Sequence, residues 1–201
     1  MGGSAVFEFK INKVLNLNEF IKLIRKAFKR KINQKDINKS EIFREFLSYH
    51  FLVDEGQVSI HLYHKENRLV LFLPPMIFNN LHYFVNIIKV VYNFCKVGAY
   101  GEDSESVSEQ EYDLKNSKMK DLRIWSVNLF TQSEVQKYGR GKLLKAPCEL
   151  IEEWEDDAIF MMIHKDRFSS TYEERRKLRK YLGEDNLPSN FQGKYLNGVY
   201  Q

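Results

Sequence analysis

Five histidines and two cysteines are the residues best suited to hold a metal ion or act as nucleophiles. Zinc in proteins normally has three or four convergent nitrogen or sulfur ligands. His61 and His64 are an odd number of positions apart on a predicted strand, so they point to opposite faces of it. Cys95 and Cys148 lie in apolar sequence and form no CxxC pair. We therefore expect no metal site and no catalytic thiol.

Motifs that carry cofactors or catalysis are missing from the sequence. It contains no GxGxxG dinucleotide loop, no GxxxxGK[ST] phosphate loop, no HExxH zinc helix and no GxSxG nucleophile turn. We expect no cofactor, no small-molecule substrate and no catalytic residue. The alternative is an enzyme whose carboxylates meet His164 or His61 only in the folded chain.

Acidic residues gather in two segments. One surrounds Trp154, and the other lies in a stretch without Lys or Arg that we interpret as a loop. A solvated hairpin tip is the simpler interpretation of the Trp154 segment; the other is a patch centred on an exposed Trp154 that binds a basic partner. The candidate partner-binding residues are Glu102, Asp103, Glu105, Glu109, Glu111 and Asp113 in the loop, and Glu153, Trp154, Glu155, Asp156 and Asp157 at the tip.

Basic residues concentrate in two predicted helices, and a solvated helix face is their usual meaning. A nucleic-acid or anionic-surface binding protein is the alternative. The net charge of only +4, the acidic segments and the absence of an RNP-like pattern make nucleic acid the less favoured partner. The residues concerned are Lys22, Arg25, Lys26, Lys29, Arg30 and Lys31 in the first helix, and Arg175, Arg176, Lys177, Arg179 and Lys180 in the last.

The elements that must position these residues follow from hydrophobic periodicity. With 43% apolar residues in 201, the chain can bury a sizeable core. Alternation of apolar and polar residues predicts strands, and apolar residues three and four apart predict helices. In the first half we expect a strand at 6–11, helices at 17–28 and 40–52, a hairpin from 58 to 73 and a core helix within 77–97.

The second half repeats a strand–helix–hairpin–helix order. A strand at 122–130 is followed by the capping-box spacing of Thr131 and Glu134, and by a helix ending at Gly139. Strands at 149–155 and 158–164 form a hairpin, and a last helix starts at Ser170 or Thr171 and ends at Gly183. The prediction is an α+β fold whose antiparallel or mixed sheet carries helices on one face. It is one domain over 1–201, with halves at about 6–97 and 121–183 joined by an acidic loop at 98–120.

Cellular location follows from what the segments lack. The N-terminus has neither the basic start nor the apolar run of a secretory signal. The longest apolar stretch, at 77–97, carries too many Asn and Lys residues for a membrane span. We expect a cytoplasmic protein with reduced cysteines.

Residues 122–183 resemble the C-terminal part of immunity proteins from bacterial polymorphic and contact-dependent toxin systems. The matching features are Trp125, Thr131, Tyr138-Gly139, Leu143-Leu144, Ala146-Pro147, the hairpin at 149–164, Phe168 and Leu182-Gly183. The resemblance implies a protein that binds and neutralises a cognate toxin or effector by surface complementarity, without catalysis or cofactor. It assigns no binding residues, and the two acidic segments are our candidates for meeting a basic toxin surface.

Overall fold

Strands and helices occur in both halves of the chain, so the predicted α+β class is confirmed. The computed structural model describes residues 5–11, 17–28, 46–53, 56–63, 68–103 and 124–184. It forms two compact units, Met1–Gly101 and Glu102–Gln201, and the division falls within the predicted loop at 98–120.

The first unit is built on antiparallel strands. Strand β4 lies between β3 and β1, with Leu71 opposite both Ile60 and Phe7. Leu69, Leu71 and Leu73 of β4 are buried, as expected for a strand with neighbours on both sides. The strand order is β2-β3-β4-β1-β5, where β5 continues to the first residues of the second unit. The strands are β1 (Ala5–Lys10), β2 (Phe46–Val53), β3 (Gly56–Tyr63), β4 (Arg68–Leu73) and β5 (Ala99–Asp103).

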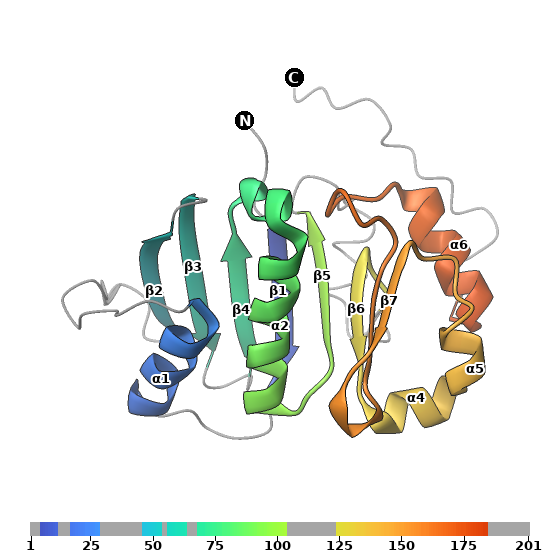
Figure 1. Ribbon diagram of the computed structural model, residues 1–201, viewed down its shortest axis with the longest axis horizontal. Helices are drawn as coiled ribbons and strands as arrows, with labels where there is room; N and C mark the ends of the chain where they lie inside the picture. The colour runs from blue at the N-terminus through green and yellow to red at the C-terminus, as the bar shows by residue number, and fades with distance from the viewer. Residues whose placement is uncertain are drawn as a thin grey trace. The chain divides into compact units, whose positions relative to one another are not determined.

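Helices α1 (Leu17–Phe28) and α2 (Leu81–Cys95) pack against each other and lie on one face of these strands (Figure 1). A 3-10 turn, η2 (Pro75–Asn80), leads into α2, and the Asn80 side chain caps it by accepting a hydrogen bond from the Tyr83 amide at 3.1 Å. Phe84 of α2 is fully buried. Among the described residues, no helix is long and apolar enough to cross a membrane.

The predicted helix at 40–52 is wrong where the structure can test it. Residues 46–52 belong to β2, and residues 40–45 lie outside the described part of the chain. The segment Phe46–Val53 pairs along its whole length with Gly56–Tyr63. Its aromatic and aliphatic residues fit a helical spacing as well as a strand, and pairing with a neighbouring strand decided between the two.

The second unit is organised around β8 (Ile159–Met162), which pairs antiparallel with both β6 (Val127–Phe130) and β7 (Leu150–Glu153). The short helices α4 (Gln132–Tyr138) and α5 (Arg140–Leu143) follow β6, and α6 (Tyr172–Leu182) ends the described chain. Ile159, Met161 and Ile163 form a core with residues of these helices, namely Val135, Leu143, Leu178 and Leu182. The predicted strand at 122–130 is shorter than expected, since β6 begins at Val127.

The predicted capping box at Thr131 is present, and a second one lies at Thr171. The Thr131 amide binds the Glu134 carboxylate at 2.9 Å, and the Thr171 amide binds Glu174 at 2.7 Å. Gly139 ends α4 and Gly183 ends α6, both with positive φ angles that favour glycine. Local sequence therefore defines the ends of these helices correctly.

Candidate functional site

The tip of the β7–β8 hairpin carries four exposed carboxylates, Glu153, Glu155, Asp156 and Asp157, which we call the acidic tip. Residues Glu155–Asp157 form a 3-10 turn, η3, in which Asp156 and Asp157 have φ angles of 62° and 56°. Asp and Asn tolerate this left-handed region better than most residues. The sequence thus favours a tight turn that presents its acidic side chains to solvent.

Arg140 of α5 binds two members of the acidic tip. Its guanidinium forms an ion pair with Glu153 and a hydrogen bond of 3.1 Å with Asp157. Gln132 donates a further hydrogen bond to Asp157 at 3.3 Å. The turn thus brings four carboxylates together, of which Arg140 pairs with those of Glu153 and Asp157.

The prediction that Trp154 is exposed is wrong. Its exposure is 6%, and its indole ring stacks on Phe160 with a centroid distance of 4.9 Å and an interplanar angle of 6°. The indole N–H donates to Glu152 at 2.9 Å. The buried indole of Trp154 anchors the acidic tip, because its packing on Phe160 holds the end of β7 against β8.

The acidic loop predicted at 98–120 begins as a strand instead. Glu102 and Asp103 belong to β5, and Glu102 is buried with an exposure of 5%. Glu102 is therefore not available to a partner, which corrects its assignment to a surface loop. The other candidates in this segment, Glu105, Glu109, Glu111 and Asp113, lie outside the described residues.

Glu102 belongs instead to a buried polar cluster with Ser126, Ser170, Arg175 and Arg179. The Glu102 carboxylate accepts a hydrogen bond of 2.7 Å from the Ser126 hydroxyl and lies 3.4 Å from the Arg175 guanidinium. Arg175 also donates to the carbonyl of Ser170, and Arg179 donates to the carbonyl of Ile124 at 3.1 Å. Arg179 in addition covers the ring of Trp125, 5.5 Å from its centroid.

Two of the five basic residues predicted on the solvated face of the last helix are thus inside the second unit. Arg175 and Arg179 have exposures of 1% and 0%, whereas Lys177 and Lys180 are exposed. The buried cations satisfy carbonyls and a carboxylate and cannot reach phosphate groups. In the first helix, the described cations Lys22, Arg25 and Lys26 are exposed as predicted.

His164 is the histidine around which the structure gathers carboxylates. It follows β8, and its ring nitrogens face Glu149 at 3.3 Å (Nδ1) and Glu174 at 3.0 Å (Nε2). Burial alone would raise the pKa of Glu174, but hydrogen bonds from Thr171 and His164 outweigh it and hold that pKa at about 2. Hydrogen bonds from the Lys165 amide and from His164 also lower the pKa of Glu149.

His61 has a different environment. Its ring lies 4.6 Å from the ring of Phe72 and 5.9 Å from that of His50, and burial together with His50 lowers its pKa. His50 in turn is hydrogen-bonded to Ser59 at 2.7 Å. His64 lies outside the described residues. Of the two histidines in the enzyme alternative, His164 is therefore the one whose ring nitrogens face carboxylates.

Cys95 and Cys148 do not form a disulfide with each other. Burial raises the pKa of Cys148 to about 12, so its thiol stays protonated near neutral pH. Since the thiolate is the nucleophilic form, Cys148 is a poor nucleophile.

A hydrogen bond between Tyr138 and Glu184 links the C-terminal end of α4 to the residue that follows the C-cap of α6. The Tyr138 hydroxyl donates to Glu184 at 2.8 Å, and Lys137 binds the same oxygen at 2.8 Å. Burial, followed by the hydrogen bond to Glu184 and its charge, raises the pKa of Tyr138 to about 12. The unfolded chain would ionise this phenol near pH 10, so its contribution to stability is complete below about pH 10 and is lost as the pH rises toward 12.

We expect Tyr138 to remain protonated while ordinary tyrosines ionise. In an ultraviolet titration, the wild type and Tyr138→Phe should therefore show equal numbers of ionised tyrosines up to roughly pH 11. Circular dichroism at each pH shows that both proteins stay folded. An extra tyrosinate in the wild type with a midpoint near pH 10 would contradict the arrangement with Glu184.

Sequence reasoning identified His164 but missed its neighbours. Glu149 and His164 flank the two strands of one predicted hairpin, and the register that pairs Leu150 with Met162 brings them together. Residues at equal distances from the hairpin tip lie opposite each other, so the proximity of Glu149 and His164 could have been predicted from the sequence. Arg140 gave no comparable signal, since its place beside the acidic tip depends on how α5 packs.

No protein-family model matches this chain, and no curated protein has a significantly similar sequence. The resemblance of residues 122–183 to immunity proteins therefore stays a prediction.

Proposed function

We propose that this protein binds another protein without catalysing a reaction, and that its partner is a cognate toxin or effector that it neutralises. The observation that carries the proposal is the acidic tip. Its carboxylates stand on a turn whose backbone is held by the buried Trp154 and by Arg140. An ordered surface of one charge sign suits recognition of a basic partner, because opposite potentials speed encounter and fix register.

The nucleic-acid alternative has weaker support. One of its two basic segments is the last helix, where Arg175 and Arg179 are buried. The exposed cations that remain there share their helix with Glu173 and Glu174. Salt-dependent retention on DNA or RNA would favour this alternative over the proposed function.

The first candidate for the partner is the protein encoded by the adjacent reading frame, and co-expression of the two proteins tests it. Co-expression should abolish the toxicity of that product, and the two proteins should purify as a complex. A neighbouring product that is not toxic, or that is toxic but neither bound nor neutralised, would refute the proposed function.

Glu155→Lys tests the acidic tip within that complex. This residue is exposed and is not one of those that bind Arg140, so the turn should keep its structure. We expect the association rate to fall about 10-fold at low salt, with a smaller difference at high salt, because the tip steers a basic partner. Stopped-flow kinetics measure this, and Gln136→Lys, on the exposed side of α4, is the control. Equal association rates for Glu155→Lys and wild type would show that the partner docks elsewhere.

A further inference from the structure

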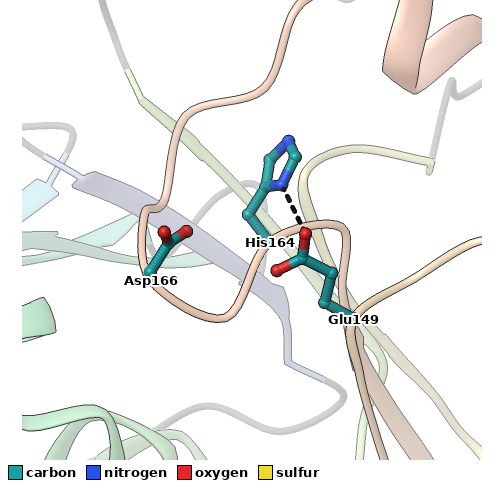
Figure 2. A group of neighbouring side chains, drawn as sticks. All are labelled: Glu149, His164 and Asp166. Atoms are coloured by element: carbon teal, nitrogen blue, oxygen red, sulfur yellow. Dashed lines mark hydrogen bonds and ion pairs between the residues drawn. The ribbon is translucent and has the colours of Figure 1, made fainter.

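A second cluster lies at the other end of the β7–β8 hairpin from the acidic tip. Glu149 precedes β7, His164 follows β8 and Asp166 lies on the loop that leads to α6 (Figure 2). Each offers one ligand atom, and the three atoms lie within 4.8 Å of one another. Hydrogen bonding of the Glu149 amide to the Ile163 carbonyl, at 3.1 Å, fixes the two chain segments beside each other.

The ring of His164 is held from the side opposite this cluster. Its Nε2 faces Glu174 at 3.0 Å, and the other oxygen of Glu174 is bound by the Thr171 amide at 2.7 Å and hydroxyl at 3.0 Å. The α6 capping box therefore anchors the carboxylate that orients the imidazole. With the proton on Nε2, the lone pair of Nδ1 points toward Glu149.

A carboxylate that holds the distal N–H of a histidine is a recurrent feature of metal sites. It fixes the tautomer and ring orientation and makes the ligating nitrogen more basic. Glu174 is suited to this role, since one of its oxygens faces Nε2 while the other is held by the Thr171 amide and hydroxyl. The oxygen of Glu149 that faces His164 is distinct from the one that accepts the Lys165 amide, so the backbone steadies this carboxylate without blocking its free side.

Two cations lie near this cluster: the Arg167 guanidinium on the Nε2 side of His164, and Lys165, whose positive charge acts on Glu149. The Arg167 guanidinium is 2.9 Å from Nε2 of His164 and 3.5 Å from Glu174. Because a guanidinium only donates, Nε2 cannot donate to Glu174 and accept from Arg167 at the same time. With the proton on Nε2, Arg167 pairs with the Glu174 carboxylate instead. The Nδ1 side presents the carboxylates of Glu149 and Asp166.

We propose that Glu149, His164 and Asp166 bind a divalent transition-metal ion such as Zn²⁺. One imidazole and two carboxylates suit a borderline ion, and three protein ligands leave a fourth position for water. Ligands about 2.0–2.1 Å from a tetrahedral ion lie about 3.4 Å apart. The three ligand atoms would therefore have to approach one another by at most about 1.4 Å, and the side chains of Glu149 and Asp166 are exposed and able to move. This site is independent of the proposed protein-binding function.

Calorimetric titration of the full chain with ZnCl₂, after treatment with a chelator, tests the site. We expect one ion per chain in the wild type and loss of that binding in His164→Ala. Mn²⁺ should bind more weakly than Zn²⁺, and Mg²⁺ more weakly still. His82→Ala and Glu155→Gln, which remove an exposed imidazole and an exposed carboxylate elsewhere, should bind as the wild type does.

Glu174→Gln gives the sharper test, because Glu174 would affect the metal ion only through His164, although it also caps α6. We expect zinc affinity about 10- to 100-fold below that of the wild type. Thermal unfolding without zinc shows whether each variant is folded, and any unfolded variant is replaced by Glu149→Gln or Asp166→Asn, which should each weaken zinc binding at least about 10-fold. Zinc uptake that is equal in wild type and His164→Ala, or a preference for Mg²⁺, would overturn the proposal.

Discussion

Glu102→Gln is expected to lower the free energy of unfolding of the second unit by about 3–5 kcal/mol, the range for breaking a buried ion pair. The variant keeps the shape of the side chain but removes the charge that faces Arg175, whose exposure is 1%. The guanidinium then stays in the interior without the negative charge of Glu102 beside it. The effect is large because folding still removes Arg175 from water but no longer places the carboxylate charge of Glu102 beside it.

Tryptophan fluorescence during urea unfolding measures this effect in the correct unit. The chain has two tryptophans, Trp125 and Trp154, and both belong to Glu102–Gln201. Glu155→Gln, an exposed carboxylate of the same unit, is the matched control and should change stability by less than about 0.5 kcal/mol. The double variant Glu102→Gln/Arg175→Met should recover much of the loss, since it removes both members of the pair. A single variant as stable as the control would contradict the pairing.

Phe160→Ala is expected to destabilise the same unit by about 3–5 kcal/mol. Phe160 is fully buried on the central strand β8 and supports the stacked ring of Trp154. Removing its ring leaves a cavity and frees the indole beneath the acidic tip. The fluorescence of Trp154 should then shift to longer wavelength even in the folded variant.

Phe160→Leu separates the loss of the aromatic contact from the loss of volume. It retains most of the buried apolar surface and should cost clearly less than the alanine variant. If Phe160→Ala unfolds with the midpoint of the wild type, the packing of β8 described above is wrong.

Local signals accounted for much of the second unit. The capping boxes at Thr131 and Thr171 and the glycines at 139 and 183 act within a few residues of the helix ends that they define. Hairpin β7–β8 follows from alternation on both sides of Asp156 and Asp157. Such features depend on neighbouring residues alone, which is why the sequence is sufficient to predict them.

Long-range contacts account for the errors. Residues Phe46–Val53 became a strand because β3 pairs with them, although their apolar spacing also fits a helix. Arg175 is buried beside Glu102, which belongs to a strand far away in the sequence. Nothing in the sequence around either residue indicates that the two pair. Trp154 is buried because Phe160 lies under it.

The candidate sites divide in the same way. Glu153, Glu155, Asp156 and Asp157 were predicted at a hairpin tip, and the structure places them there. The surroundings of His164 required three separate pieces of chain to meet, namely the start of β7, the loop after β8 and the first turn of α6. The spacing of residues along the sequence does not indicate that these three segments lie together.

The buried pair of Glu102 and Arg175 also bears on the order in which the second unit folds. Helix α6 can form early, because its capping box and Gly183 are local, but docking it before β5 is in place would bury the Arg175 guanidinium without the charge of Glu102. We therefore expect α6 to dock after the main folding barrier. In a chevron analysis, Glu102→Gln should accelerate unfolding and leave the folding rate nearly unchanged, giving a φ-value near zero.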